Sequence, residues 1–452
     1  MSQKLSLSTR VILRAEPQYY DTYVAFDYEN ARTEFLKKEE YKVLEYIYDK
    51  TADVREICNA AGLKYVSCVR FLKRMMQLGF VEVGAEGFKV NPPERWENDL
   101  KLYQGFPLPF LSAPTSVDVF ITSRCNLKCV HCFSGGEEKG SQELSATDLG
   151  SIFTELEKLG VFEVRINGGE PFLHSDIGKI LMDLKTRRFR KVILTNGTLL
   201  DEKNVILLKE SGIIPTVSLD DAVAEEHDLF RGVEGSFQRT VEGLELLNKN
   251  GVQYGLNCCL HRRNLSRPKE VIDLAVKHGA SKIAFLDLKV VGRMKNHFEW
   301  VPPYEEYQKI FNDLIVAKVR YGKKIDVSLD VFLHCYPLRE TIREGKRGYI
   351  SCHAGKNRLA IDSKGSIYPC NLVLSDPRWC MGNLRNETLL AIWFSKKWLF
   401  FRGGVRISDL QRCRSCQDLT KCKDFYCRLL PYVAFGDAYA PHPRCGLPSS
   451  TL

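Results

Sequence analysis

The middle of the chain alternates between apolar, β-branched runs and amphipathic stretches. The apolar runs are strand-like and lie at 116–122, 162–168, 191–197, 216–220, 254–260 and 282–290. Between them, stretches such as 146–160, 176–187 and 236–251 carry apolar positions at helical spacing. Six strand–helix units in series predict an α/β fold with a parallel sheet. The sheet either curls into a partial barrel or stays open, and in both cases a functional site belongs at the carboxyl ends of the strands.

The chain in front of this region reads as a small separate domain. Strands are expected at 8–16 and 22–28, and a closing hairpin from 80–84 and 87–91. Helical spacing is found at 37–50, 53–62 and 64–79. Strands, three helices and a hairpin are typical of a winged helix-turn-helix. We therefore predict four regions, which are a winged-helix-like domain (1–92), a proline-punctuated linker (93–114), the α/β region (115–325) and a cysteine-rich tail (326–452).

Composition narrows the class of protein. The 452 residues are 44% hydrophobic, which is enough for a sizeable core. No run is long and apolar enough to span a membrane, and the start lacks a signal peptide, so a cytoplasmic protein without a membrane partner is expected. In a reducing cytosol, sixteen cysteines indicate metal ligands rather than disulfides. The net charge of +9 is typical of a solvated basic surface.

Three cysteines follow the first strand of the α/β region as C-x3-C-x2-C. They are Cys125, Cys129 and Cys132. Thiolates are the usual ligands of iron–sulfur clusters, and three of them leave one iron of a cubane open for a ligand outside the protein. The alternatives are a redox pair or a zinc site completed by His131, which sits awkwardly between two of the cysteines.

The spacing resembles the cluster motif of the radical S-adenosylmethionine (SAM) superfamily. Further stretches agree in order, since NGGEP, TNG and SLD each end a predicted strand. The resemblance implies a partial (β/α)6 barrel, a catalytic 4Fe–4S cluster on the three cysteines, and reductive cleavage of SAM to a 5′-deoxyadenosyl radical. It also implies SAM contacts at Gly168, Gly169, Glu170, Thr195, Asn196, Ser218, Asp220, Arg231 and Asn257.

The cysteines of the tail resemble the SPASM extension of radical SAM peptide maturases, which binds two auxiliary 4Fe–4S clusters. The alternative is a pair of zinc ribbons. The resemblance implies three clusters in all, with the distal one on Cys413, Cys416, Cys422 and Cys445 and the proximal one on Cys352, Cys370 and Cys427. The proximal set has only three ligands. Either Cys335 folds back as the fourth, or an iron stays open for a cysteine of the substrate.

A winged helix first suggests DNA binding, and Lys64, Arg70, Lys73 and Arg74 lie on the third expected helix. Radical SAM peptide maturases, however, often begin with a domain of this shape, the RiPP recognition element. It captures the leader of a precursor peptide by adding a strand to a sheet edge. Because the domain precedes a region that resembles a radical SAM barrel and a SPASM tail, leader recognition is favoured, with no nucleic-acid partner.

Together the three parts resemble thioether-forming maturases of cysteine-rich peptides, the sactionine and ranthipeptide synthases that include the SCIFF-peptide maturases. The implied activity is an oxidoreductase that joins a peptide cysteine sulfur to the carbon of an acceptor residue. One electron leaves through an auxiliary cluster, and ferredoxin or flavodoxin is the expected donor for SAM cleavage. The alternatives are a formylglycine-forming sulfatase-type maturase, a carbon–carbon cross-linking maturase, and an iron–sulfur transcriptional sensor.

Overall fold

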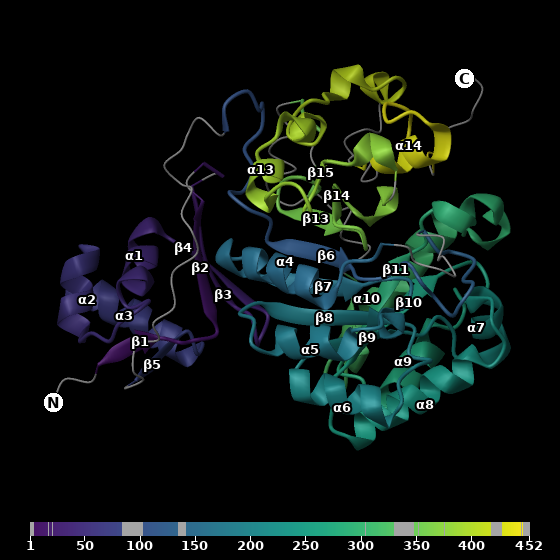
Figure 1. The fold of residues 1–452 in the computed structure, drawn as a ribbon, viewed down its shortest axis with the longest axis horizontal. Helices are drawn as coiled ribbons and strands as arrows, with labels where there is room; N and C mark the ends of the chain where they lie inside the picture. The colour runs from purple at the N-terminus through teal and green to yellow at the C-terminus, as the bar shows by residue number, and fades with distance from the viewer. Residues whose placement is uncertain are drawn as a thin grey trace.

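The computed structural model describes residues 4–83, 103–133, 142–329, 348–416, 427–443 and 445, apart from 17, 20, 303, 351 and 375. A small N-terminal domain, a central α/β region and a C-terminal part lie in that order along the chain (Figure 1). No helix among these residues is long and apolar enough to cross a lipid bilayer.

Seven parallel strands of the central region lie in one sheet. They lie side by side in chain order: β6 (Ser116–Phe120), β7 (Glu163–Asn167), β8 (Arg190–Thr195), β9 (Ile214–Ser218), β10 (Gly255–Leu260), β11 (Lys282–Asp287) and β12 (Asp326–Ser328). The six strands predicted from the sequence are confirmed. The seventh, β12, carries the parallel sheet past residue 325, where the sequence suggested that the α/β region ends.

Seven helices connect and flank these strands. They are α4 (Ala146–Lys158), α5 (Ile177–Lys185), α6 (Glu202–Ser211), α7 (Ala224–Arg231), α8 (Ser236–Lys249), α9 (Pro268–Lys277) and α10 (Tyr304–Tyr321). Because every crossover moves to the next strand in the same direction, right-handed connections put all helices on one face of the sheet. The sheet then curves with its other face inward. This topology is the partial (β/α)6 barrel rather than a doubly wound sheet.

The alternation of side chains along the strands follows the curvature. Val117, Val164, Ile193, Val217 and Leu256 are fully buried and pack in the main core with the inner faces of the helices. The intervening positions point to the concave side and include charged residues. The core is therefore between sheet and helices, and the concave face is the one available to a ligand.

The C-terminal part continues the same sheet. β13 (Arg358–Ile361) pairs in parallel with β6, and the antiparallel strands β14 (Ser366–Tyr368) and β15 (Gly382–Asn383) follow it. Two short helices, α13 (Leu389–Trp393) and α14 (Leu429–Phe435), complete the described part. Since one sheet runs through both regions, the cysteine-rich tail is fixed rigidly to the first barrel strand (Figure 1).

The N-terminal domain has the predicted three helices, α1 (Lys38–Tyr46), α2 (Val54–Ala61) and α3 (Tyr65–Gln77). Its three-stranded sheet has the order β2 (Val11–Glu16), β3 (Thr22–Asp27), β4 (Arg32–Leu36), and β1 (Leu5–Leu7) pairs with β5 (Val81–Val83). The expected hairpin partner of β5, residues 87–91, lies outside the described residues. Sequence periodicity did not indicate β1 or β4, because one is very short and the other is a charged edge strand.

This domain rests on the amino-terminal end of the barrel strands. Phe26 of β3 stacks on Phe162, just before β7, with ring centroids 4.7 Å apart. Arg14 donates to the carbonyl oxygen of Ala113 at 2.8 Å, and Arg188 donates to that of Thr9 at 3.0 Å. The N-terminal domain is therefore at the opposite end of the strands from the cysteine motif that comes after β6.

Candidate active site

The three cysteines of the C-x3-C-x2-C motif lie on a loop after β6, which we call the cysteine loop (residues 121–133). Burial, together with the neighbouring Cys129 and Cys132, raises the pKa of Cys125 to about 11, so the three thiols lie close together. Their loop is held by backbone hydrogen bonds from Lys128 to Arg231 (3.1 Å) and from Val130 to Phe230 (2.9 Å). The structure thus brings the predicted cluster ligands together.

The NGGEP segment packs directly against this loop. The amide of Gly169 donates to the carbonyl of Thr122 at 2.9 Å, and that of Glu170 donates to the carbonyl of Arg124 at 2.7 Å. A Cβ on Gly169 would lie 2.2 Å from the Arg124 oxygen, and one on Gly168 would lie 2.9 Å from the Thr122 oxygen. The two glycines are required for this close backbone approach, one residue before the first cluster cysteine.

Glu170 is fully buried at the end of β7. Its carboxylate accepts hydrogen bonds from the hydroxyl of Thr195 (2.7 Å) and the amide of Asn196 (2.7 Å), and both of these donors are neutral. Burial raises the pKa of Glu170 to about 7, although these hydrogen bonds and the charge of Arg231 act in the opposite direction. A buried carboxylate with neutral donors is well suited to a ligand ammonium group, which would offset its desolvation.

Asn196 ties the third strand end to the cysteine loop. Its side-chain amide donates to the Oδ1 of Asn126 at 2.9 Å, and its own Oδ1 accepts from the amide of Thr198 at 2.9 Å. The predicted residues Glu170, Thr195 and Asn196 are therefore one hydrogen-bonded group beside Cys125.

Asp220 and Arg231 form a buried ion pair, with Nε and Oδ2 2.5 Å apart. The other oxygen of Asp220 accepts from the amide of Cys259 at 2.8 Å, and Arg231 also contacts the sulfur of Cys129 at 3.8 Å. Burial alone would raise the pKa of Asp220, but the charge of Arg231 lowers it to about 2. In this arrangement Asp220 holds Arg231 against the cysteine loop, and the SAM contacts expected of both residues stay predictions.

Ser218 and Asn257 face each other on neighbouring strands, β9 and β10, and both are partly exposed on the concave side. An aromatic stack that the sequence did not reveal lies nearby. His131 stacks on Phe230 with centroids 4.3 Å apart, and Phe230 packs on His261 (4.1 Å) and Trp300 (5.2 Å). These residues are far apart in sequence, so no local pattern could have brought them together.

The sequence analysis also did not predict the charged side chains on the concave face of the sheet. Asp118 of β6 accepts hydrogen bonds from Arg165 of β7 (2.8 Å) and from Arg358 of β13 (3.0 Å). Two residues nearer the amino ends of the strands, Glu163 pairs with Arg190 at 3.3 Å. A sequence signal existed, because a charged residue interrupts otherwise apolar strands in SVDVF and FEVRI. The network fastens the first strand of the tail to the barrel.

Cys352, Cys370 and Cys427 form a second thiol group. Burial raises the pKa of Cys370, and the nearby Cys427 and Cys352 raise it further. The charge of Arg358 opposes this shift at Cys370, and that of Lys289, which lies just after β11, opposes it at Cys427. Cys370 follows β14, and Cys352 comes just before the bridge of Ala354 to β13, so the group lies beside these two strands.

The distal set is only partly described. Cys413 and Cys416 lie in one turn, where the amide of Cys416 donates to the carbonyl of Cys413 at 3.2 Å. A hydrogen bond from Gln411 to Tyr439 brings this turn toward the segment that carries the exposed Cys445. Cys422 lies outside the described residues, as does Cys335, so the distal ligand set stays a prediction.

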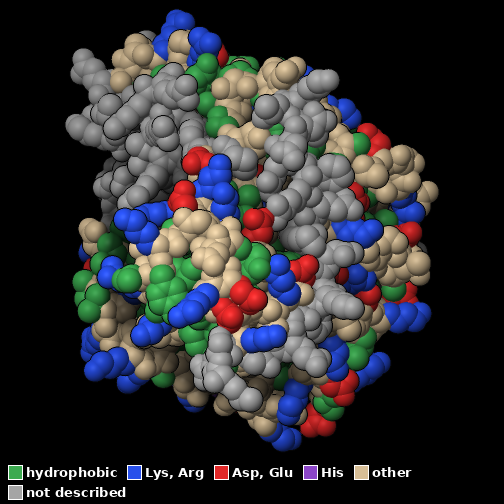
Figure 2. Space-filling view, turned by 90° about the vertical axis from the view of Figure 1, so that its left-hand side faces the viewer, with side chains coloured by type: hydrophobic (Ala, Val, Ile, Leu, Met, Phe, Trp, Pro, Cys, Tyr) green, Lys and Arg blue, Asp and Glu red, His purple; other side chains and the backbone are tan. Residues whose placement is uncertain are grey.

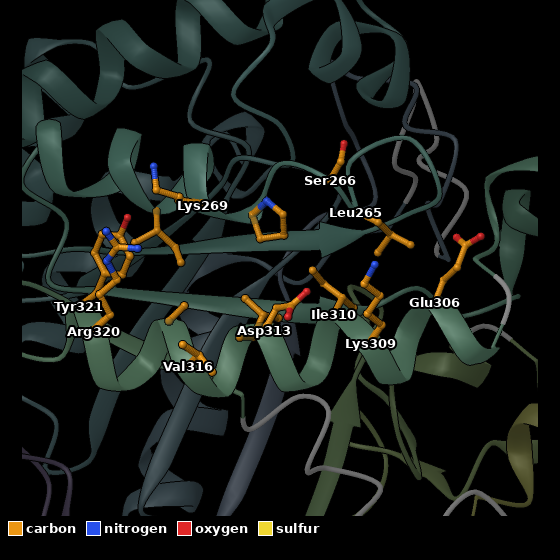
Figure 3. A pocket seen from close by; sticks show the side chains of 14 residues that line it. Leu265, Ser266, Lys269, Glu306, Lys309, Ile310, Asp313, Val316, Arg320 and Tyr321 are labelled. Atoms are coloured by element: carbon orange, nitrogen blue, oxygen red, sulfur yellow. The ribbon is translucent and has the colours of Figure 1, made fainter.

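A pocket of about 480 Å³ lies elsewhere, between α9 and α10 (Figure 3). Ile272, Ile310 and Leu314 are among its apolar residues, and Lys269 and Lys309 are among its charged ones. It contains no residue of the cysteine loop or of NGGEP. The pocket is therefore not the candidate active site.

Two sequence families match the chain. The radical SAM superfamily matches residues 119–275, and the SPASM iron–sulfur cluster-binding domain matches residues 352–417. The chain contains a radical SAM domain and a SPASM domain. The first match covers the cysteine loop and all the expected SAM contacts, and the second covers the tail cysteines from Cys352 to Cys416.

The chain is similar in sequence to curated proteins and in fold to solved structures. The AdoMet-dependent heme synthase of Methanosarcina barkeri is 28% identical over 351 residues, covering 74% of this chain and 97% of its own. The mycofactocin maturase MftC of Mycolicibacterium smegmatis is 28% identical over 342 residues, covering 74% and 83%. Streptococcus suis SuiB, solved with its precursor peptide SuiA, shares the fold with a TM-score of 0.72 and 18% identity over 98% of this chain and all of SuiB.

The domains imply 4Fe–4S clusters and SAM, and the residues present fit both. Among the described residues, no three His, Cys, Asp or Glu side chains are arranged to hold a single metal ion. A cubane instead takes each thiolate at a different corner. Cys125, Cys129 and Cys132 would hold the cluster in the radical SAM domain, and Glu170 with its neutral donors offers a site for the SAM ammonium group.

Proposed function

We propose that the protein is a radical SAM peptide maturase that forms intramolecular thioether bonds in a ribosomally made, cysteine-rich precursor peptide. The observation that carries the proposal is the second thiol group. Three protein thiols, and no fourth among the described residues, gather beside β13 and β14 and pack against the main core. A centre with a free coordination position at that place is suited to bind a substrate thiol.

The hydrogen and electron balance of the reaction matches such a site. When SAM and the first cluster are bound, they supply a 5′-deoxyadenosyl radical that takes one hydrogen atom from the acceptor carbon of the peptide. The peptide thiol would lose its proton, its sulfur would bond to that carbon, and the surplus electron would pass to an auxiliary cluster held by the tail cysteines. The peptide therefore loses two hydrogens per bridge. Metal coordination lowers a thiol pKa, and a fixed sulfur beside the carbon makes bond formation one oriented step.

The residues around the cysteine loop would position SAM and the first cluster and shield them from water. Arg231, held by Asp220, covers one side of the cysteine loop. Gly168 and Gly169 let the Glu170 loop approach it. The aromatic stack of His131, Phe230, His261 and Trp300 closes the neighbouring side with apolar surface. Among the described residues, we find no side chain whose geometry requires it to be the general base.

The N-terminal domain supports a peptide as the substrate. The fold of SuiB, which was solved with a precursor peptide, extends over this domain, whereas the alignment with the heme synthase covers 74% of the chain. In the described residues β4 pairs only with β3, and all but one of its residues are at least partly exposed. An extended leader can add to this edge as a fourth strand.

Three other functions are distinguishable. A formylglycine-forming maturase consumes a peptide thiol without forming a bridge, and a carbon–carbon cross-linking maturase forms a bridge without consuming one. A transcriptional sensor would not turn over SAM. The first test is therefore reductive SAM cleavage by the reconstituted protein, measured as 5′-deoxyadenosine with dithionite as reductant. We expect turnover that the precursor stimulates, with ferredoxin or flavodoxin as the natural electron donor.

Cys335 offers a direct test of the open position. If the proximal centre has a free iron, Cys335→Ala keeps the parental iron content and still forms thioethers. Native precursor should then change the spectrum of that centre, and a precursor with serine in place of cysteine should not. Loss of the centre in Cys335→Ala, together with an unchanged spectrum on adding precursor, would show that Cys335 closes the site.

A further inference from the structure

Glu143 holds the start of the cysteine loop, although the sequence analysis did not single it out. Its Oε1 accepts hydrogen bonds from the hydroxyl of Thr122 at 2.5 Å and from the amide of Ser123 at 3.2 Å. Its Oε2 accepts from Nη2 of Arg124 at 3.2 Å. One carboxylate therefore fixes the three consecutive residues that come directly before Cys125, the first expected cluster ligand.

Two of these residues also hold the Glu170 loop. The carbonyl of Thr122 accepts from the amide of Gly169 at 2.9 Å, and that of Arg124 accepts from the amide of Glu170 at 2.7 Å. The backbone that Glu143 fixes therefore leads into the cluster cysteines and also carries the loop expected to face SAM. Because it acts through this backbone, Glu143 is a positioning residue.

The residue after Glu143 joins this site to the tail. The amide of Leu144 donates to the carbonyl of Ser363, two residues after β13, at 2.8 Å, and its carbonyl lies 3.1 Å from Nε2 of His174. Nδ1 of His174 accepts from the amide of Asp176 at 3.1 Å, so Nε2 carries the proton and donates to Leu144. Because Leu144 is held from two sides, the neighbouring carboxylate is fixed against the cysteine loop.

Arg124 brings a positive charge next to the first cluster ligand. Among the described residues Glu143 is its only ion-pair partner, and the side chains of Glu143 and Arg124 are 12% and 32% exposed. Figure 2 shows acidic and basic side chains close together on the N-terminal side of the molecule, but pairs in the N-terminal domain such as Arg74 with Glu34 are more open, at 49% and 25%. Water screens charges at such open sites, whereas the partly buried charge of Arg124 acts more strongly on its surroundings.

We propose that Glu143, by neutralising Arg124, keeps the reduction potential low for the cluster that the cysteine loop would hold. A nearby positive charge favours the reduced state of a cluster, because reduction adds an electron, and so raises its potential. With the arginine charge balanced the potential stays low, which favours transfer of the electron to SAM. The inference depends on the radical SAM domain and is independent of thioether formation.

The test is an anaerobic redox titration of the reconstituted full-length protein, followed by electron paramagnetic resonance. The signal of the first cluster is identified because SAM changes it and because it is missing when all three cysteines of the cysteine loop are alanine. We expect Glu143→Gln to increase the equilibrium constant for one-electron reduction about tenfold, which raises the potential by about 59 mV. Glu143→Asp keeps the charge and should stay closer to the parental potential.

Arg124→Gln is the opposite change and should lower the potential by a similar amount, because it leaves the charge of Glu143 unbalanced. The double variant Glu143→Gln/Arg124→Gln should return to the parental potential, a rescue that the loss of backbone hydrogen bonds alone does not give. Glu155→Gln is the matched control, since Glu155 of α4 also accepts from a backbone amide, that of Leu389 at 2.7 Å, outside the cysteine loop. It should leave the potential unchanged.

A parental potential in Arg124→Gln, or a double variant that keeps the raised potential of Glu143→Gln, would overturn the proposal. So would an equal shift in Glu155→Gln. If Glu143→Gln does not hold the cluster, Arg124→Gln still decides, because it keeps the hydrogen bonds of Glu143 to Thr122 and Ser123. The titration contains no peptide, so its failure is distinct from a failure to form thioethers.

Discussion

The approach of Gly169 to the cysteine loop gives a sharp prediction. In Gly169→Ala the new methyl group would lie 2.2 Å from the carbonyl oxygen of Arg124 and 2.7 Å from that of Ser123. Ordinary contact begins near 3.4 Å, so the Glu170 loop and the cysteine loop must separate by more than 1 Å. Backbone atoms on both sides leave no flexible side chain to absorb the shift.

This separation should weaken SAM binding and distort the geometry of the cluster ligands. Overpacking of this kind typically costs about 1–3 kcal/mol, and a misplacement of about 1 Å at a reacting centre can lower a rate about a hundredfold. We expect Gly169→Ala to fold, to bind SAM at least tenfold more weakly, and to form 5′-deoxyadenosine about a hundredfold more slowly. SAM affinity is measured by anaerobic equilibrium dialysis, and cleavage by chromatography of the quenched reaction.

Gly178→Ala is the control, because Gly178 lies in α5 and a Cβ there meets only Leu207, at 3.8 Å. That variant should be neutral or slightly more stable, by up to about 1 kcal/mol, since alanine favours a helix over glycine. Parental SAM affinity and cleavage rate in Gly169→Ala would refute the assignment of this loop to SAM.

Three further outcomes are expected. Alanine at all three cysteines of the cysteine loop should abolish SAM cleavage and remove about four irons per chain, as one cubane holds, while iron bound by the tail remains. Asp118→Asn leaves Arg165 and Arg358 without their shared buried carboxylate and should lower the thermal unfolding midpoint, at a cost of about 2–3 kcal/mol, as followed by circular dichroism. Phe26→Ala removes the stack on Phe162 and should speed proteolysis between the N-terminal domain and the barrel without changing SAM cleavage; parental protease resistance would show that the stack does not hold the domains together.

Local patterns predicted most of the fold. The six barrel strands and the helices of the N-terminal domain follow from hydrophobic periodicity, which local sequence determines. Periodicity could not decide between an open sheet and a partial barrel, because that choice depends on strand order. The structure supplies that order. β4 was missed for a related reason. An edge strand with Arg32, Thr33 and Glu34 lacks the alternation that marks a half-buried strand.

The candidate site likewise has features that sequence motifs predicted and features that depend on tertiary packing. The cysteine loop, Glu170 and Asn196 were predicted from motifs, and the structure brings them together. The ion pair of Asp220 with Arg231 was not predicted, because Arg231 lies on helix α7 rather than at a strand end. Long-range groups such as the network of Asp118 or the stack on Phe230 depend on tertiary packing.

The mass of the precursor peptide after reaction tests the central claim most directly. The reconstituted protein is incubated with SAM, a reductant and the precursor, and the product is treated with a thiol-alkylating reagent before tandem mass spectrometry. Our account predicts the loss of two hydrogens per bridge, one fewer alkylated cysteine for each, and fragment ions that join a cysteine sulfur to an acceptor carbon. A product that loses two hydrogens but keeps every cysteine alkylatable, or loses a thiol without a cross-link, would contradict thioether formation.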